Sequence, residues 1–318
     1  MRFLASRLHS ARTLLGRHPF GTRKHLAAGM AAALAVTAAA LLCPARAEAY
    51  CRSTTCLTDC QPDLDECKTQ GFPLYWASMC VGFSLQKDGS VDLAMDDVRR
   101  VAVASFATWA DVECPTGTAS LTFSELADVT CAKAEYNPDG QNANIVLFQD
   151  YKWNYTGEFN TLAKTTVTYD ASSGEILDAD IELNQAFNEL TTSDTVVVYD
   201  LQSILTHEIG HFIGLDHSMD FDATMTPGYE QGATDLRTIA PDDIAGVCAI
   251  YPPARPAVCA PTPRGGLGDL CYAQATAGDR GCSCGLASPA RKGSYGLLVL
   301  GCSIGLAARR LRVRRLKA

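Results

Sequence analysis

Basic side chains are scarce through most of this 318-residue chain. Residues 50–281 hold 12 Lys and Arg against 34 Asp and Glu, so this middle region carries a net charge near −22. A surface of that sign repels phosphate, which excludes a nucleic-acid-binding role. Hydrophobic residues make up 47% of the chain, enough to bury a core, so intrinsic disorder is excluded as well. No internal repeat is visible, and the middle region has the length of one domain with small appendages.

Histidine is also rare, because the chain has six and three of them, His9, His18 and His25, lie within the first 49 residues. The other three stand together between positions 207 and 217. A serine or cysteine hydrolase that depends on histidine would have to use one of these three. If they bind a metal, that class of mechanism is excluded.

The first 49 residues differ from the middle region. A basic stretch precedes the uncharged, mostly apolar run Leu26–Leu42, and small residues follow it. This three-part pattern predicts a secretory signal peptide over residues 1–49, with cleavage after Ala47 or Ala49. A retained membrane anchor is the alternative, although the run is slightly short and rich in alanine for a span.

Residues 282–318 begin with Cys282 and Cys284 and continue through the apolar run Gly293–Ala308 into a basic tail. The arrangement resembles the tripartite C-terminal sorting signals of myxobacterial surface proteins. That resemblance implies processing near Cys282 or Cys284 and attachment at the cell surface. A plain membrane anchor is the alternative, with membrane contact retained unless the tail is processed. Both place the middle region outside the cytoplasm.

The cysteines between the two ends agree with an oxidising compartment, because their even number predicts a disulfide framework. We expect Cys259 to pair with Cys271 and Cys114 with Cys131 in short loops, while the rest of the connectivity is open. A metal knuckle in the cluster Cys51–Cys67 is an alternative, weakened by its lack of histidine. The ten cysteines concerned are Cys51, Cys56, Cys60, Cys67, Cys80, Cys114, Cys131, Cys248, Cys259 and Cys271.

Hydrophobic periodicity predicts a folded domain over residues 74–253, between a Cys-rich lead-in at 50–73 and a Pro-rich, disulfide-stapled linker at 254–281. Asp200 is placed to cap the second of three expected helices, and Pro241 suits the first position of the third. The helices are expected at Leu93–Asp111, Asp200–Leu215 and Pro241–Ile250. The strands are expected at Leu74–Leu85, Leu121–Leu126, Asn144–Gln149, Thr165–Asp170 and Ile176–Asn184.

The strongest signal is the run His-Glu-Ile-Gly-His-Phe-Ile-Gly-Leu-Asp-His-Ser at residues 207–218. On a helix, His207 and His211 lie one turn apart and can reach one metal ion, with Glu208 beside them as a general base. Gly214 lets the chain leave the helix, so that His217 becomes a third ligand. Three nitrogen ligands and one open position describe a catalytic zinc, whereas satisfied core histidines are the plainer alternative.

This motif resembles that of the metzincin metalloproteases and, because Ser218 follows the third histidine, that of the matrixins. The resemblance implies that Met225 forms the Met-turn beneath the zinc and that Pro227 and Tyr229 continue into the wall of the primed-side specificity pocket. It also implies that an Asp at 242 or 243 supports the Met-turn backbone. The fold expected is α+β, a twisted mixed sheet of about five strands with three helices and the zinc cleft at the second helix.

The chain also departs from animal matrixins. No histidine remains for a second, structural zinc, so we expect one zinc per molecule. Calcium is a further candidate, held by Asp178, Asp180 and Asn184 or by the loop 139–142, with a solvated acidic surface as the alternative. The Pro-Arg-Cys-Gly motif, by which many matrixins keep themselves latent, is absent. A cysteine thiolate from Cys51–Cys67 that occupies the open zinc position is the alternative route to latency.

We therefore expect a monomeric, exported or surface-attached zinc endopeptidase that acts on protein or peptide substrates. Zinc would be held by His207, His211 and His217, and Glu208 would be the catalytic base. Two alternatives stay open. One is a non-catalytic surface adhesion module that keeps the fold, and the other is a metal-dependent hydrolase of a bond other than the peptide bond.

Overall fold

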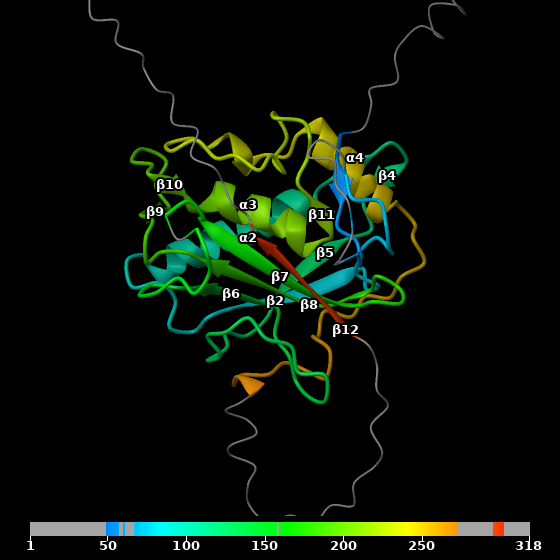
Figure 1. Cartoon of the computed structure of the whole chain (residues 1–318), viewed down its shortest axis with the longest axis horizontal. Coiled ribbons are helices and arrows are strands. Elements are labelled where there is room, and N and C mark those ends of the chain that lie inside the picture. Colours follow the sequence, from blue (N-terminus) through cyan, green and yellow to red (C-terminus); the bar gives the residue numbers. More distant parts are fainter. Residues whose placement is uncertain (1–48, 57–59, 61–66, 158, 273–294, 302–318) are drawn as a thin grey trace, which may run out of the picture. The chain divides into compact units, whose positions relative to one another are not determined.

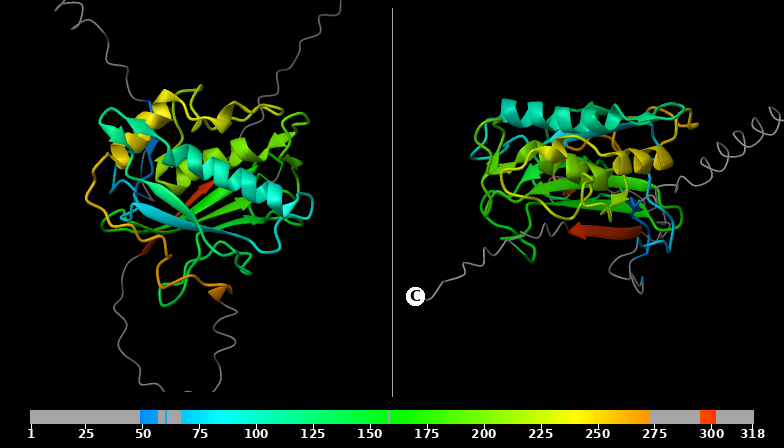
Figure 2. Two further views of the ribbon diagram at one scale, coloured as in Figure 1. Left: turned by 180° about the vertical axis from the view of Figure 1, so that it is seen from behind. Right: turned by 90° about the horizontal axis from the view of Figure 1, so that it is seen from above.

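The computed structural model describes residues 49–56, 60, 67–157, 159–272 and 295–301, the last of these by its backbone alone. The expected signal peptide, up to residue 48, and residues 282–294 and 302–318 of the expected sorting signal lie outside the described residues. Within the described part a mixed sheet carries two helices on one side, and a third helix follows the site (Figures 1 and 2).

The sheet has the order β12-β7-β8-β6-β2-β5. The pairs β2–β5, β2–β6 and β6–β8 are parallel, whereas β7 runs antiparallel to β8 and to β12. Five of these strands match the five expected from the sequence, and β12 at the edge is an addition. The strands are β2 (Cys80–Leu85), β5 (Thr122–Glu125), β6 (Ile145–Phe148), β7 (Ala163–Asp170), β8 (Ile176–Leu183) and β12 (Tyr295–Gly301).

Helices α2 (Met95–Ala110), α3 (Leu201–Phe212) and α4 (Pro241–Ile250) confirm the three helices expected. The apolar side of α2 packs on the sheet, where Phe106 stacks on Phe83 with ring centroids 3.9 Å apart. The indole Nε1 of Trp109 donates to the carbonyl oxygen of Thr206 in α3 over 2.7 Å. The two helices are therefore joined by a buried hydrogen bond as well as by packing.

Short elements complete the described part. Three two-stranded pairs lie outside the main sheet, and a 3-10 helix, η1 (Asp235–Arg237), precedes α4. The first pair joins the lead-in to the residues just after α3, so the N-terminal end of the described chain lies against the site. The pairs are β1 (Cys51–Arg52) with β11 (Leu215–Asp216), β3 (Glu113–Cys114) with β4 (Gly117–Thr118), and β9 (Leu190–Thr191) with β10 (Tyr199–Asp200).

The first expected strand is shorter than the sequence indicates. Residues 74–79 are rich in apolar and aromatic side chains, but their backbone groups form no continuous ladder with a strand of the sheet. The amide of Leu74 donates to Ser53 O, that of Tyr75 to Gly174 O, and that of Trp76 to the hydroxyl of Tyr251. Burial of Leu74 and Trp76 therefore accounts for the apolar signal there, and β2 begins at Cys80.

The ten cysteines form five disulfides, which confirms the framework but not the two loops expected. Cys114 pairs with Cys248, not Cys131, and Cys259 and Cys271 pair with distant partners instead of with each other. Residues 254–271 return across the domain, so each cysteine there meets a residue of the core, and sequence proximity was the wrong guide. The pairs are Cys51–Cys67, Cys56–Cys60, Cys80–Cys259, Cys114–Cys248 and Cys131–Cys271.

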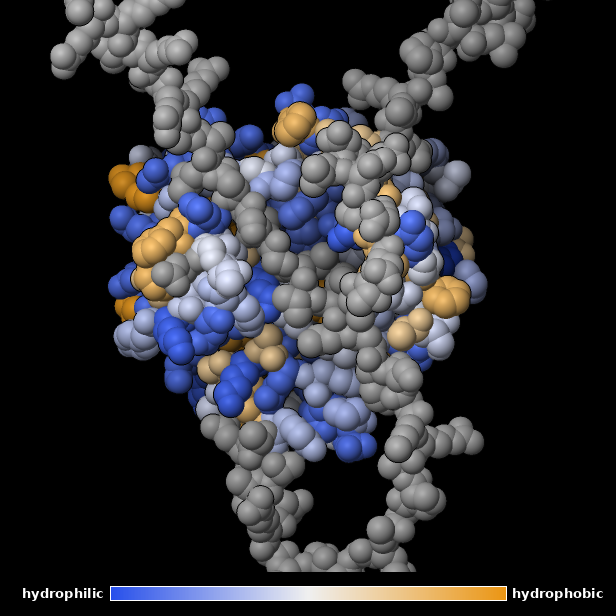
Figure 3. Space-filling model, viewed as in Figure 1, coloured by the Kyte–Doolittle hydropathy of each residue, from blue (hydrophilic) through white to orange (hydrophobic). Residues whose placement is uncertain are grey.

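The surface seen in the direction of Figure 1 is mostly hydrophilic, with hydrophobic side chains scattered near its margin (Figure 3). Scattered apolar residues of this kind are ordinary on the surface of a folded protein. Among the helices of the described residues, none is both long and apolar enough to cross a bilayer.

The long-range disulfides predict unequal contributions to stability. Replacing Cys80 and Cys259 by Ser removes a link across 179 residues, whereas the same change at Cys56 and Cys60 removes one across 4. Because stabilisation grows with the closed loop, we expect a loss of about 3–5 kcal/mol for the first pair and at most about 2 kcal/mol for the second. Guanidinium unfolding of the two variants measures this, and equal losses would contradict it.

Candidate metal centre

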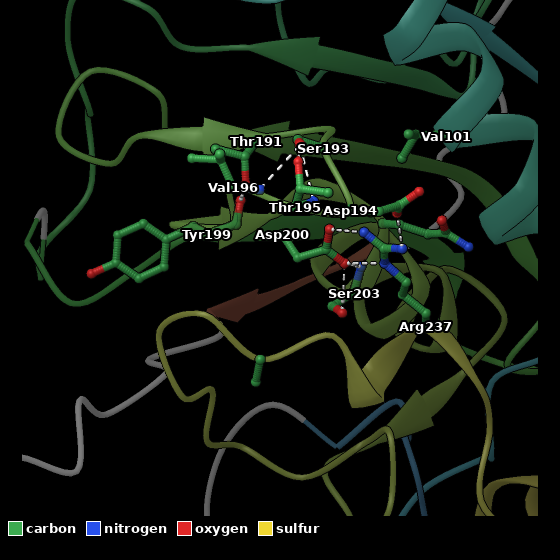
Figure 4. Close-up of polar contacts among 12 residues, drawn as sticks. Val101, Thr191, Ser193, Asp194, Thr195, Val196, Tyr199, Asp200, Ser203 and Arg237 are labelled. Atoms are coloured by element: carbon green, nitrogen blue, oxygen red, sulfur yellow. Dashed lines mark hydrogen bonds and ion pairs between the residues drawn. The ribbon is translucent and has the colours of Figure 1, made fainter.

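The start of α3 is fixed by a buried carboxylate. Asp200, fully buried, accepts from the backbone N–H of Ser203 over 2.9 Å, which confirms the expected N-cap. Arg237 donates to both oxygens of Asp200, over 2.8 and 2.7 Å, and also pairs with Asp194 (Figure 4). This two-pronged pair compensates the buried charge and holds the helix that carries the site.

Two histidines project from α3 on the same side, as their spacing predicts. Both side chains are 1% exposed. The Nδ1 of His207 lies 2.7 Å from Thr224 O, and the Nδ1 of His211 lies 3.0 Å from Leu215 O. A carbonyl oxygen can only accept, so each ring carries its proton on Nδ1 and turns an unprotonated Nε2 toward the centre.

The third histidine is brought back by the turn after the helix. Gly214 has φ +97°, a left-handed conformation, and a Cβ there would lie 2.6 Å from Leu74 O. Only glycine suits both conditions. The ring centroid of His217 then lies 5.3 Å from that of His207 and 4.9 Å from that of His211.

These three side chains form a cluster with metal-ligand geometry. One ligand atom from each lies within 4.8 Å of the other two. Burial lowers the pKa of His207 to about 3 and that of His211 well below its usual value, and it lowers that of His217 as well. The three rings are therefore neutral, the form that binds a metal. Among the described residues, the buried Nε2 of His211 has no hydrogen-bond partner, so the donor set fits a zinc ion.

Glu208 lies between the two helical histidines and is fully buried. Its Oε2 accepts from the hydroxyl of Thr165, on β7, over 2.5 Å, while its Oε1 has no protein partner among the described residues. Burial raises the pKa of Glu208 to about 7, and the hydrogen bond from Thr165 opposes the rise. A carboxylate tuned to near neutrality can both accept and return a proton.

The turn that contains Met225, beneath the histidines, is held in place by α4. Met225 is 1% exposed and packs so closely on α3 that a Cβ at Gly210 would lie 2.1 Å from its sulfur. The carboxylate of Asp243 accepts from the backbone N–H groups of Thr224 and Met225, over 2.8 and 3.1 Å. The same Thr224 offers its carbonyl to His207, so α4, the Met225 turn and the first ligand form one connected unit.

The sequence profile of the matrixin family, Peptidase_M10, matches residues 75–252, which is more than half of the chain. The chain belongs to the matrixin family. Matrix metalloproteinase-C of Caenorhabditis elegans is 28% identical over 186 residues, which cover 55% of this chain and 28% of that protein.

Two further relatives match. Metalloendoproteinase 1-MMP of Arabidopsis thaliana is 27% identical over 186 residues, 56% of this chain and 44% of that protein. Human neutrophil collagenase is 41% identical over a shorter stretch of 63 residues, 20% of this chain and 14% of that protein. The chain thus spans less than half the length of each of these relatives.

The segment after Met225 contains Pro227 and Tyr229, the two residues that the sequence predicts for the wall of the specificity pocket. Tyr229 is 5% exposed, donates to Ala233 O over 2.7 Å and accepts from the N–H of Asp200 over 2.8 Å. Pro227 is half-buried two residues earlier. Tyr229 therefore ties the segment after the Met-turn to the N-terminus of α3. Its role at a substrate pocket stays a prediction.

Of the acidic residues considered for calcium, Asp178 and Asp180 are not a solvated surface, whereas Asp139 of the loop 139–142 is exposed, as that alternative expects. Asp178 and Asp180 are each 1% exposed, and burial raises the pKa of both. Asp180 accepts from the backbone N–H groups of Ile145 and Glu135, over 3.0 and 2.9 Å. In the loop 139–142, the side-chain amide of Asn142 is bonded to three carbonyl oxygens. These contacts assign the groups a structural role, and nothing in them identifies calcium.

Two features of this matrixin have no counterpart in the sequence motifs. Thr165 contacts Glu208, but a hydroxyl on a strand carries no recognisable pattern. Lys164 and Glu182, 4% and 3% exposed, form an ion pair of 4.0 Å, and Tyr155 donates to the same carboxylate. In the sequence, the only signal for this pair is a lysine just before one expected strand and a glutamate within the next.

The second metal-type cluster, at Cys131, Glu135 and Cys271, offers no thiolate because its cysteines form a disulfide.

The support from α4 can be tested by replacing Asp243 with Asn. The amide has one acceptor oxygen for three N–H donors, because Ala240 also donates to Asp243. Unsatisfied buried donors cost about 1–3 kcal/mol each, so we expect a loss of about 3 kcal/mol in unfolding free energy and a weaker hold on zinc. Asp242→Asn is the matched control, since Asp242 accepts from Ala49, Tyr50 and Ser218 and not from the Met-turn. Equal losses would contradict the role of Asp243.

Proposed function

We propose that this matrixin is a zinc-dependent endopeptidase that hydrolyses peptide bonds of proteins outside the cytoplasm. The observation that carries the proposal is the buried cluster of three neutral imidazoles with the carboxylate of Glu208 beside it. Membership of the matrixin family supports it, as do the metalloproteinase and collagenase names of the relatives.

His207, His211 and His217 would hold the zinc, which supplies Lewis acidity toward a water molecule and a substrate carbonyl when it is bound. Glu208 takes the proton from the attacking water and returns it to the leaving amine. Thr165 fixes one carboxylate oxygen and leaves the other, Oε1, for this exchange. Burial keeps bulk water from competing for the same proton.

A binding module that keeps the fold is the second candidate, but Glu208 argues against it. A fully buried carboxylate is costly when one of its oxygens has no partner among the described residues. A module that only binds would have no use for it, and Gln at this position would be less costly. The family relationship also favours the peptide bond over another amide.

We also propose that the enzyme works outside the cytoplasm. Five disulfides in 34.0 kDa fit an oxidising compartment. The N-terminal and C-terminal sequences support export and attachment at the cell surface. The acidic middle region, with 34 acidic and 12 basic residues, favours basic protein substrates over anionic ones by long-range steering. We expect the enzyme to be a monomer.

The mechanism predicts that Glu208→Gln lowers kcat/KM for casein by about 10²–10⁴ while zinc content stays at one ion per chain. The amide keeps the shape of the side chain but cannot accept the proton. Glu189→Gln, at an exposed site, is the matched control and leaves activity unchanged. If the zinc-loaded, fully oxidised Glu208→Gln variant cleaved casein as well as the parent enzyme does, the assignment would be refuted.

Zinc removal provides an independent test of the metal. A chelator should abolish casein hydrolysis, and stoichiometric zinc should restore it, because the three imidazoles that would hold the ion are neutral and need lose no proton to rebind it. Unchanged hydrolysis in the metal-free protein would exclude a metal mechanism. If zinc-loaded protein does not cleave casein either with or without its C-terminal tail, the binding module becomes the better assignment.

Export predicts a defined N-terminus. The mature chain should begin at Glu48 or Tyr50, because the small residues Ala47 and Ala49 suit the signal-cleavage site. Mass spectrometry of the protein released into the medium measures this. A chain that keeps its first 47 residues would contradict the signal peptide and favour the retained anchor.

A further inference from the structure

The outer edge of β7 is covered by the chain's own C-terminal region. Strand β12 (Tyr295–Gly301) pairs antiparallel with β7 along seven residues, from Tyr295 opposite Asp170 to Gly301 opposite Lys164. In the view from above, β12 and α2 lie at opposite margins of the described structure (Figure 2). Without β12, β7 would be the edge strand of the sheet, with a free row of backbone N–H and C=O groups.

That row lies next to the site. Thr165 of β7 donates its hydroxyl to Glu208, and in the strand register Thr165 is paired with Leu300 of β12. Gly301 is paired with the preceding residue, Lys164. The C-terminal end of β12 therefore lies beside the part of β7 that contacts the catalytic carboxylate.

A peptide substrate needs the same backbone groups. Extended peptides commonly bind by adding a strand to a sheet edge, with main-chain hydrogen bonds supplying affinity. The inner side of β7 is already paired with β8 from Ala163 to Tyr169, so only the outer side can accept another strand. A peptide that pairs there beside Thr165 has its backbone next to Glu208. The strand β12 and an incoming peptide exclude each other.

We propose that Tyr295–Gly301 is a built-in inhibitory strand that competes with the peptide substrate for the outer edge of β7. This inference rests on the proposed peptidase function, since it concerns access to the same site. The strand Tyr-Gly-Leu-Leu-Val-Leu-Gly has no charged side chain to discourage edge pairing and no proline to remove a backbone donor. It belongs to the same chain, so its effective concentration is on the order of millimolar.

The inhibited state is relieved when the strand leaves. The same residues fall within the apolar run Gly293–Ala308, which the sequence predicts to be a membrane segment. One segment cannot pair with β7 and lie in a bilayer at once. Cleavage upstream of Tyr295, or insertion of the run into a membrane, therefore opens the edge of β7 and activates the enzyme.

Controlled release of the tail tests the proposal. A recognition sequence for a site-specific protease is inserted between residues 273 and 294 of the full chain, which is folded, oxidised and loaded with zinc before cleavage. The five disulfides of the described residues lie at or before Cys271, so the cut leaves these five intact. We expect hydrolysis of a short fluorogenic peptide to rise at least about tenfold after the released tail is removed.

Adding the strand back completes the test. A synthetic peptide of residues 295–301, with lysines at both ends for solubility, should raise KM without changing kcat in the released enzyme. A peptide of the same composition in scrambled order is the control. Inhibition by the scrambled peptide to the same degree would overturn the assigned pairing.

Two proline substitutions in the intact chain form a matched pair. In an antiparallel strand successive N–H groups point alternately toward and away from the neighbour, so only one of Leu298 and Val299 donates to β7. Proline is tolerated where the N–H faces outward and breaks the pairing where it faces inward. We expect one of Leu298→Pro and Val299→Pro to activate the intact enzyme and the other to change it little. Activity equal to that of the parent chain in both would overturn the proposal.

Hydrogen exchange separates this proposal from the assigned function. In zinc-loaded Glu208→Gln protein, which needs no activity for the measurement, β7 amides bonded to β12 should exchange faster after tail release. Unchanged exchange, or equal hydrolysis before and after release of active enzyme, overturns the inhibitory strand alone. Protein that hydrolyses no peptide in either state, yet shows the change in exchange, overturns the peptidase function.

Discussion

Three imidazoles must be kept neutral, close together and turned toward one point, and the rest of the domain is organised around that requirement. Burial excludes the protonated forms, and carbonyl oxygens at Thr224 and Leu215 fix two of the rings. Those carbonyls lie on segments after the helix, not on the helix itself. The site therefore depends on how the chain returns to α3 as much as on α3.

The return of the chain is secured by charged groups that have no part in the chemistry. Asp243 holds the backbone beneath the histidines, and α4, which carries it, is linked to the end of β3 by Cys114–Cys248. At the other end of α3, Asp200 is held by Arg237. Buried carboxylates that accept backbone N–H groups are rigid supports, because moving them leaves several donors unsatisfied at once. The same logic applies to Asp180, which ties Glu135, in the connection between β5 and β6, and the first residue of β6 to β8.

Sequence reasoning succeeded wherever the information is local. The spacing of His207 and His211 is a property of the helix, the need for glycine at 214 is a property of one backbone angle, and α4 follows from Pro241 and the prolines after Ile250. It failed where partners are distant. Nothing near Cys259 indicates Cys80, and nothing near Thr165 indicates Glu208, because both contacts arise only when the sheet and α3 are assembled. The start of the first strand was missed for a related reason, since Leu74 and Trp76 are buried but their backbone N–H groups bond to other segments.

The C-terminal strand shows a limit of composition as a guide to structure. A run of apolar and small residues is compatible with a membrane-spanning segment and with a strand of a sheet, so hydropathy alone does not choose between these two placements. The backbone decides, because in a bilayer its polar groups must be satisfied within a helix, whereas here β7 offers partners to a strand. Sixteen residues from Gly293 to Ala308 are few for a helical span, at about 1.5 Å per residue against about 30 Å of hydrocarbon. Because the run is short, its insertion into a bilayer is less favourable than that of a longer span. The free energies of the two placements, in the bilayer and at the edge of β7, therefore differ less, and a small difference is what a reversible switch requires.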